Sequence, residues 1–137
     1  MIGVLITTHG RLGHELVKVA ELIKGQLKAV LLVSIEEDKS MEATTNEMAG
    51  TIKKLDDGDG VVVLTDLFGG TPSNIALSFV KKRKMEVVTG VNLPMLLKLY
   101  DIREENNLRK LACDLKESGR NNIYVAGEFL EKNSSTT

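Results

Sequence analysis

Two residues far apart in the chain, His9 and Asp66, have side chains that suit phosphoryl chemistry. A carboxylate that accepts a hydrogen bond from one ring nitrogen of a histidine fixes the imidazole tautomer and leaves the other nitrogen free as a nucleophile. The carboxylate also stabilises the positive charge that develops on the ring during attack on phosphorus. If the fold brings them together, this pair predicts a histidine that accepts a phosphoryl group.

A glycine-rich segment follows Asp66 and offers groups that bind an anion. Gly69 and Gly70 let backbone N–H groups approach a phosphate closely, and the helix expected after them presents its positive N-terminus. Thr71 and Ser73 add hydroxyl donors. Taken singly, a histidine at a strand end, a Gly-Gly-Thr-Pro turn and a capping aspartate are ordinary structural features, so the prediction depends on their being neighbours in space.

The elements that would position these residues alternate between short β-branched runs and longer amphipathic stretches. We predict strands at residues 2–7, 29–34, 61–65, 86–89 and 123–126. We predict helices at residues 12–24, 40–55 and 72–82, a short one from Pro94, and one at 108–118, with Thr71 as an N-cap and Gly25 and Gly119 as stops. The strands lack polar alternation, which is typical of burial on both faces. We therefore expect an α/β fold, doubly wound, with a mostly parallel sheet and helices on both faces.

In such folds the carboxyl ends of the strands meet at one edge, where ligands bind. We expect the first and third strands to be neighbours, which would place His9 beside Asp66. The segment after the fourth strand, which contains Asn92, ends at the same edge. The predicted site consists of the catalytic pair His9 and Asp66 and of phosphate- or partner-binding positions at Thr8, Gly10, Gly69, Gly70, Thr71, Ser73 and Asn92.

Other chemically interesting residues are assigned structural roles. His14 lies off the apolar face predicted for the first helix and is expected to be solvated; that face consists of Leu12, Leu16, Val19 and Ile23. Cys113 stands among leucines and is predicted to be a small core residue. The basic run at 81–84 complements the end of the third helix. Two histidines without a nearby cysteine predict no zinc site, and no metal or cofactor is expected.

Composition places the chain among ordinary globular proteins. The length of 137 residues, with 42% hydrophobic and 27% charged residues, fits one domain and excludes a disordered chain or a rod. With 18 basic and 19 acidic residues, the chain has no general field that would attract nucleic acid or a membrane surface. One cysteine favours a reducing, cytoplasmic compartment, and we expect no leader or membrane span. We predict one domain at 1–130 and a polar, frayed tail at 131–137.

The strand-end segments together resemble the IIA component of the mannose/fructose/sorbose family of the bacterial phosphoenolpyruvate-dependent sugar phosphotransferase system. The resemblance is carried by Thr8-His9-Gly10, by the segment 66–74 (Asp-Leu-Phe-Gly-Gly-Thr-Pro-Ser-Asn) and by the segment 90–96 (Gly-Val-Asn-Leu-Pro-Met-Leu). It covers about residues 1–130.

The resemblance implies a role for the predicted site. His9 would receive a phosphoryl group on Nε2 from the phosphocarrier HPr and pass it to the IIB component, and Asp66 would hydrogen-bond the other ring nitrogen. Thr71 matches a position at which the family keeps a hydroxyl. The resemblance also implies a homodimer in which the last strand, here 123–126, is antiparallel and exchanged between subunits. The transported sugar is not readable from this chain, because in this scheme IIA does not touch sugar.

Three alternatives use similar residues. Histidine phosphatases need an arginine before the histidine and a second catalytic histidine late in the chain, whereas Thr8 stands here and His14 is the only other histidine. Receiver domains need clustered acidic residues where Thr7 and Thr8 stand. A non-catalytic regulatory module, such as the IIA-like subunit of dihydroxyacetone kinase, is disfavoured by the Gly-Gly-Thr-Pro and Asn-Leu-Pro segments.

Overall fold

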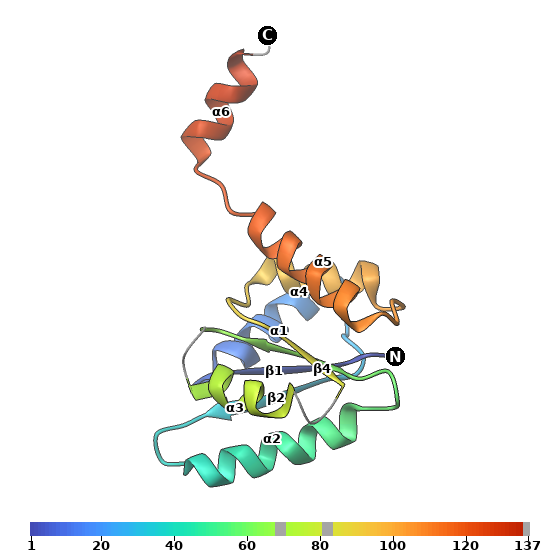
Figure 1. Ribbon diagram of the computed structural model, residues 1–137. Helices are drawn as coiled ribbons and strands as arrows, with labels where there is room; N and C mark the ends of the chain where they lie inside the picture. Colours follow the sequence, from blue (N-terminus) through green and yellow to red (C-terminus); the bar gives the residue numbers. More distant parts are fainter. Residues whose placement is uncertain (68–70, 81–83, 136–137) are drawn as a thin grey trace.

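The computed structural model describes residues 1–67, 71–80 and 84–135, without the side chains of 71–73 and 133–135. The strands in these ranges are β1 (Gly3–His9), β2 (Val30–Ile35), β3 (Val61–Thr65) and β4 (Met85–Val88). The helices are α1 (Leu12–Lys24), α2 (Met41–Leu55), α3 (Thr71–Val80), α4 (Leu93–Ile102), α5 (Leu108–Asn121) and α6 (Ala126–Ser135). Figure 1 shows their arrangement.

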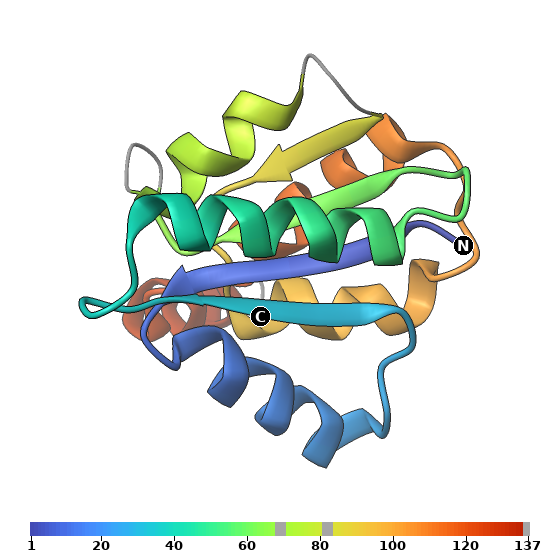
Figure 2. The same cartoon turned by 90° about the horizontal axis from the view of Figure 1, so that it is seen from below.

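The four strands form one parallel sheet in the order β2-β1-β3-β4. Figure 2 shows them side by side, with α2 in front of the sheet. The expected neighbourhood of the first and third strands is therefore confirmed, and Thr7 on β1 lies opposite Thr65 on β3. β1 and β3 are the two inner strands, which explains why their sequences are apolar on both faces.

Helices cover both faces of the sheet, as predicted. α2 and α3 pack on one face over Leu5 and Val63, with Met48, Ile52 and Ile75 in the same apolar cluster. α1, α4 and α5 pack on the other face, where the cluster includes Ile6, Leu64, Val17, Leu96 and Leu111. This two-sided cover is the doubly wound architecture.

The apolar face predicted for α1 is wrong at three of its four positions, and of the four residues only Leu16 packs against the core. The helix buries its small residues instead, namely Gly13, Val17 and Ala20, while Leu12, Val19 and Ile23 are exposed. A Cβ at Gly13 would lie only 3.0 Å from Cγ2 of Ile6, so the glycine lets the helix lie close against β1. Cys113, predicted in the core, is also exposed.

The C-terminal elements differ from the prediction. α5 continues through Gly119, where a Cβ would lie 3.0 Å from Cε of Met95, and no strand forms at 123–126 in the single chain. α5 leads the chain away from the sheet, so a strand here has no partner, and Ile123, Tyr124 and Val125 are exposed. The expected frayed tail is helical up to Ser135, and Figure 1 shows α6 set apart from the sheet and its helices.

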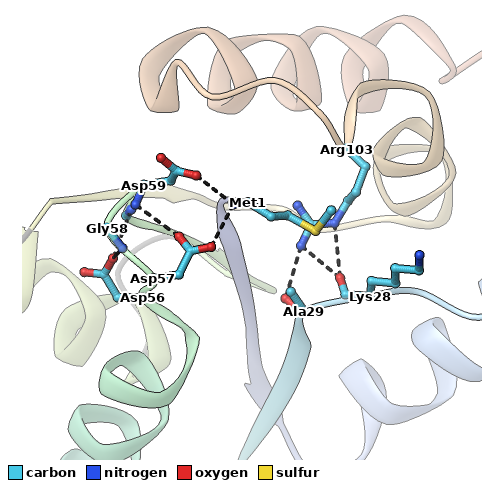
Figure 3. Close-up of polar contacts among 9 residues, drawn as sticks. Met1, Lys28, Ala29, Asp56, Asp57, Gly58, Asp59 and Arg103 are labelled. Carbon is cyan, nitrogen blue, oxygen red and sulfur yellow. Dashed lines mark hydrogen bonds and ion pairs between the residues drawn. The ribbon is translucent and has the colours of Figure 1, made fainter.

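Two polar clusters stabilise the amino edge of the sheet (Figure 3). This edge is the one opposite to His9. The α-ammonium of Met1 donates to Asp57 at 2.8 Å and to Asp59 at 2.6 Å. The buried guanidinium of Arg103 donates from Nε and Nη2 to the carbonyl oxygen of Lys28 and from Nη2 to that of Ala29. Within the described part of the chain, no helix has the length and apolarity needed to cross a bilayer.

Candidate functional site

His9 and Asp66 meet at the carboxyl edge of the sheet, although 57 positions separate them. His9 is the last residue of β1, and Asp66 directly follows β3. Nδ1 of His9 lies 3.0 Å from Oδ2 of Asp66, and the backbone N–H of His9 donates to the same oxygen at 3.0 Å. One carboxylate oxygen thus holds both the backbone and the ring of the histidine.

This contact fixes the chemical state of the imidazole. An ionised carboxylate only accepts hydrogen bonds, so in the neutral imidazole this contact favours the tautomer with the proton on Nδ1 and the lone pair on Nε2. The side chain of His9 is 50% exposed, whereas that of Asp66 is only 12% exposed. The solvent therefore reaches the imidazole ring, while the carboxylate that contacts it is largely buried.

The backbone that follows His9 is also held in place. The N–H of Gly10 donates to the carbonyl oxygen of Ile35, and the Oγ of Ser34 donates to the carbonyl oxygen of Gly10, both at 2.9 Å. Gly10 has φ +54°, a conformation that glycine adopts without strain. Sequence reasoning missed Ser34; the available signal was its place at the end of a predicted strand, since parallel pairing puts it opposite Thr8.

Thr8 lies beneath the surface rather than in the open part of the site. Its side chain is buried, and its hydroxyl accepts a hydrogen bond of 2.8 Å from the N–H of Gly13. This bond satisfies one of the free N–H groups at the beginning of α1. The structure thus shows Thr8 connecting β1 to α1 directly beside His9.

Both polar atoms of the Asn92 side chain form hydrogen bonds within the fold. Oδ1 accepts from the N–H of Met95 at 3.0 Å and caps α4, while Nδ2 donates to the carbonyl oxygen of Gly119 at 3.1 Å. These two bonds join the beginning of α4 to the end of α5. The structure gives Asn92 this joining role at the carboxyl edge.

The glycine-rich segment is only partly described. Gly69 and Gly70 lie outside the described residues, as do the side chains of Thr71 and Ser73 and most of the basic run at 81–84. α3 begins at Thr71 itself, one residue earlier than predicted. Its N-terminus follows β3 and so lies at the same edge of the sheet as His9.

His14 is half-buried and is not the solvated residue that we expected. Its Nδ1 lies 3.4 Å from the Oγ of Ser34, the hydroxyl that also holds Gly10. Lys39 donates to the carbonyl oxygen of Ser34 at 2.9 Å from the other side. Among the described residues, no group of three His, Cys, Asp or Glu side chains could hold a metal ion.

Comparisons with known proteins agree with this geometry. A family model described as the PTS system fructose IIA component matches residues 3–116. The chain is 32% identical over 133 residues to the fructose-specific EIIA component of Bacillus subtilis, covering 96% of this chain and 91% of that protein. It is also 32% identical over 124 residues to the mannose-specific EIIAB component of Escherichia coli K12, covering 89% of this chain but only 38% of that longer protein.

Solved structures give the same result. The mannose/sorbose-specific IIA subunit from Enterococcus faecalis superposes with a TM-score of 0.81 at 27% identity, covering 90% of this chain and 93% of that one. The EIIA component from Streptococcus agalactiae superposes with a TM-score of 0.84 at 26% identity, covering 93% and 99%. With a family model that matches most of its length, this chain belongs to the mannose/fructose family of IIA components of the sugar phosphotransferase system.

Proposed function

We propose that this chain is a phosphoryl relay in sugar uptake, in which Nε2 of His9 accepts a phosphoryl group from phospho-HPr and passes it to the IIB component of a mannose-family transporter. The observation that carries this proposal is the 3.0 Å contact between Nδ1 of His9 and Oδ2 of Asp66. Family membership supports a role in phosphoryl transfer, because IIA components belong to the phosphotransferase system.

On this chain, the histidine and its carboxylate carry the making and breaking of the N–P bond. The lone pair of Nε2 attacks phosphorus in line, the new N–P bond forms, and the bond to the donor histidine breaks with its electron pair returning to the donor ring. The proton stays on Nδ1, so the phosphorylated ring carries a positive charge that Asp66 stabilises. Transfer to the IIB component reverses these events, and His9 regains its neutral tautomer.

The phosphoryl oxygens need donors as well. We assign this role to the backbone N–H groups of Gly69 and Gly70 and to the hydroxyls of Thr71 and Ser73, because α3 begins at this edge with its positive end. Gly10 leaves open space beside His9, since a Cβ there would meet nothing within 4 Å. That space suits a site which two different proteins must reach in turn.

We further propose that Thr8 and Asn92 serve the site from within by holding α1 and α4 at its rim, and that residues 1–130 form the IIA domain. A chain that exchanges phosphate with HPr would work in the cytoplasm. No step in this scheme involves a metal or a cofactor.

We also propose a homodimer in which the segment 123–126 pairs with β4 of the partner. β4 is an edge strand, and a cavity of about 300 Å³ runs between it and α5, lined by residues that include Val87, Thr89 and Ala112. Residues 123–125 of this segment lie between α5 and α6, and their large apolar side chains are exposed. A strand added to a free edge would bury both surfaces at once.

Labelling tests the relay. Incubation with phosphoenolpyruvate, enzyme I and HPr should give an acid-labile, base-stable phosphate on the chain, and addition of the IIB component should remove it. His9→Ala should abolish the label, and the control His14→Ala should keep it. Label that persists in His9→Ala would contradict the assignment, and label that no IIB component removes would favour a regulatory module instead.

A further inference from the structure

Among the described residues, four buried side-chain atoms have no hydrogen-bond partner, and three of them lie together at the carboxyl ends of β1 and β3. These three are Oγ1 of Thr7, Oγ1 of Thr65 and Oδ1 of Asp66, while the fourth belongs to Arg103 at the opposite edge. Both threonines are fully buried. Buried polar atoms in folded proteins almost always have a partner, so three unpaired oxygens in one place require an explanation.

The sheet places the two hydroxyls directly inward of the candidate nucleophile. Thr7 and Thr65 face each other across β1 and β3. Each lies two residues beyond a member of the apolar cluster under α2 and α3, namely Leu5 and Val63, so their side chains share that face. His9 is the next residue in the same column of β1.

The three oxygens are chemically complementary. Each threonine hydroxyl has one proton to donate, whereas Oδ1 of Asp66 can only accept while the carboxylate is ionised. A single water molecule placed among them would also have the three polar partners that a buried water typically needs. The three oxygens do not bond one another directly, so a shared water is the arrangement that satisfies every atom of the group.

Resting on the proposed function, we propose that Thr7 and Thr65 are positioning residues for the relay. Their hydroxyls hold Oδ1 of Asp66 through one buried water and fix the carboxylate so that Oδ2 holds His9 as the Nδ1–H tautomer. Without them, the two contacts from His9 are the only ones among the described residues that would resist rotation of the carboxylate. Groups that orient a functional side chain in this way commonly have large effects on activity.

Isosteric substitutions test this role. Thr7→Val and Thr65→Val remove one hydroxyl each and keep the shape, Thr7→Ser and Thr65→Ser keep the hydroxyl, and Thr44→Val is a control at a buried threonine of α2. We expect each valine variant to slow transfer from phospho-HPr about tenfold, as for the loss of one hydrogen bond to a charged group. Nitrogen-15 NMR of unphosphorylated His9 should show a smaller Nδ1–H tautomer population, and the serine variants should restore both readouts.

Valine variants with the wild-type transfer rate and tautomer population would overturn the proposal, and so would serine variants that fail to restore either. If the valine variants do not fold, a high-resolution crystal structure of the wild-type chain decides. Hydroxyls bonded to a water that is shared with Asp66 support the proposal, and hydroxyls bonded elsewhere overturn it. A wild-type chain that takes no label would refute the relay itself, whereas the tautomer measurement would still report on the positioning of His9.

Discussion

Oδ2 of Asp66 accepts two hydrogen bonds from one residue, His9: one from the backbone N–H and one from the ring Nδ1, each 3.0 Å long. The same oxygen therefore completes the hydrogen bonding at the end of β1 and selects the imidazole tautomer. Because one bond comes from the backbone of His9 and the other from its ring, the two together fix the position of the ring relative to the sheet.

Replacing Asp66 should slow phosphoryl transfer more than it harms folding. Asp66→Asn keeps the shape but loses the charge that stabilises the phosphorylated ring, so we expect transfer to fall about 10- to 100-fold. Asp66→Ala should fall at least as far. Stopped-flow transfer from phospho-HPr measures the rate, and thermal melting measures the fold. Unchanged transfer in both variants would remove the orienting role of Asp66.

Gly10→Ala should destabilise the chain by about 1–2 kcal/mol, because φ +54° is unfavourable for a residue with a Cβ. The new methyl group meets nothing within 4 Å, so the cost comes from the backbone and not from a clash. Gly50→Ala is the matched control: it lies in α2 with equally open surroundings, and alanine there should stabilise the helix by about 0.5–1 kcal/mol. Denaturant unfolding measures the free energy of unfolding of both variants. If both substitutions stabilise the chain, or both destabilise it, this explanation is contradicted.

Arg103→Met should lower the free energy of unfolding by about 1–3 kcal/mol, because it removes both side-chain hydrogen bonds to the carbonyl oxygen of Lys28 and one to that of Ala29, which keeps its bond from the N–H of Val4. Burial lowers the pKa of the guanidinium, yet these bonds hold it in place. Transfer to and from His9 should be unaffected, since Arg103 lies at the opposite edge of the sheet. Arg120→Met, at an exposed site, should change stability by less than about 0.5 kcal/mol. A similar loss in both variants would rule out the special role of Arg103.

The α-ammonium of Met1 should link stability to alkaline pH. Its hydrogen bonds to Asp57 and then to Asp59 raise its pKa above 8.0. A raised pKa contributes stability that is present below the unfolded-state value and is lost as the pH rises through the folded-state value. Above about pH 8, Tm should therefore fall more steeply than in a chain with an acetylated α-amino group.

At acidic pH the same cluster should link stability to pH in the opposite direction, because the pKa of Asp57 is lowered. The hydrogen bond from Met1 lowers the pKa of Asp57, so this carboxylate contributes stability above about pH 4 and loses it as the pH falls through the lowered value. Melting curves between pH 3 and pH 10 for the two forms of the chain measure both limbs. Parallel curves over the whole range would show that the cluster does not contribute.

The proposed dimer depends on backbone pairing at 123–126. Val125→Pro removes an N–H from the segment, and proline is not tolerated in the middle of a paired strand, so we expect the variant to be a monomer. Val125→Thr is the control and should remain a dimer. Sedimentation velocity distinguishes the two states. A monomeric wild-type chain would refute the exchange, and so would a proline variant that remains a dimer.

The contact between His9 and Asp66 was predictable because parallel strands end at a common edge and their order follows from a few rules of connection. The buried face of α1 was not predictable, because a search for apolar periodicity gives weight to large side chains and none to glycine. Gly13 determines how this helix packs, since its missing Cβ allows close contact with β1. The contacts of Ser34 with Gly10 and His14 depend on the register between strands, which no local motif encodes. The segment 123–126 has strand-forming residues, but a strand forms only where an edge is within reach.

The shared oxygen of Asp66 also turns the amide proton of His9 into a reporter. Because Oδ2 accepts from both the ring and the backbone, a carboxylate that swings away from the ring also frees the amide proton to exchange with solvent. The exchange rate at this one position would then report how often the ring of His9 loses its contact with Asp66. Comparing the exchange rate in the free and partner-bound forms would show whether binding of the partner strengthens or weakens the contact between His9 and Asp66.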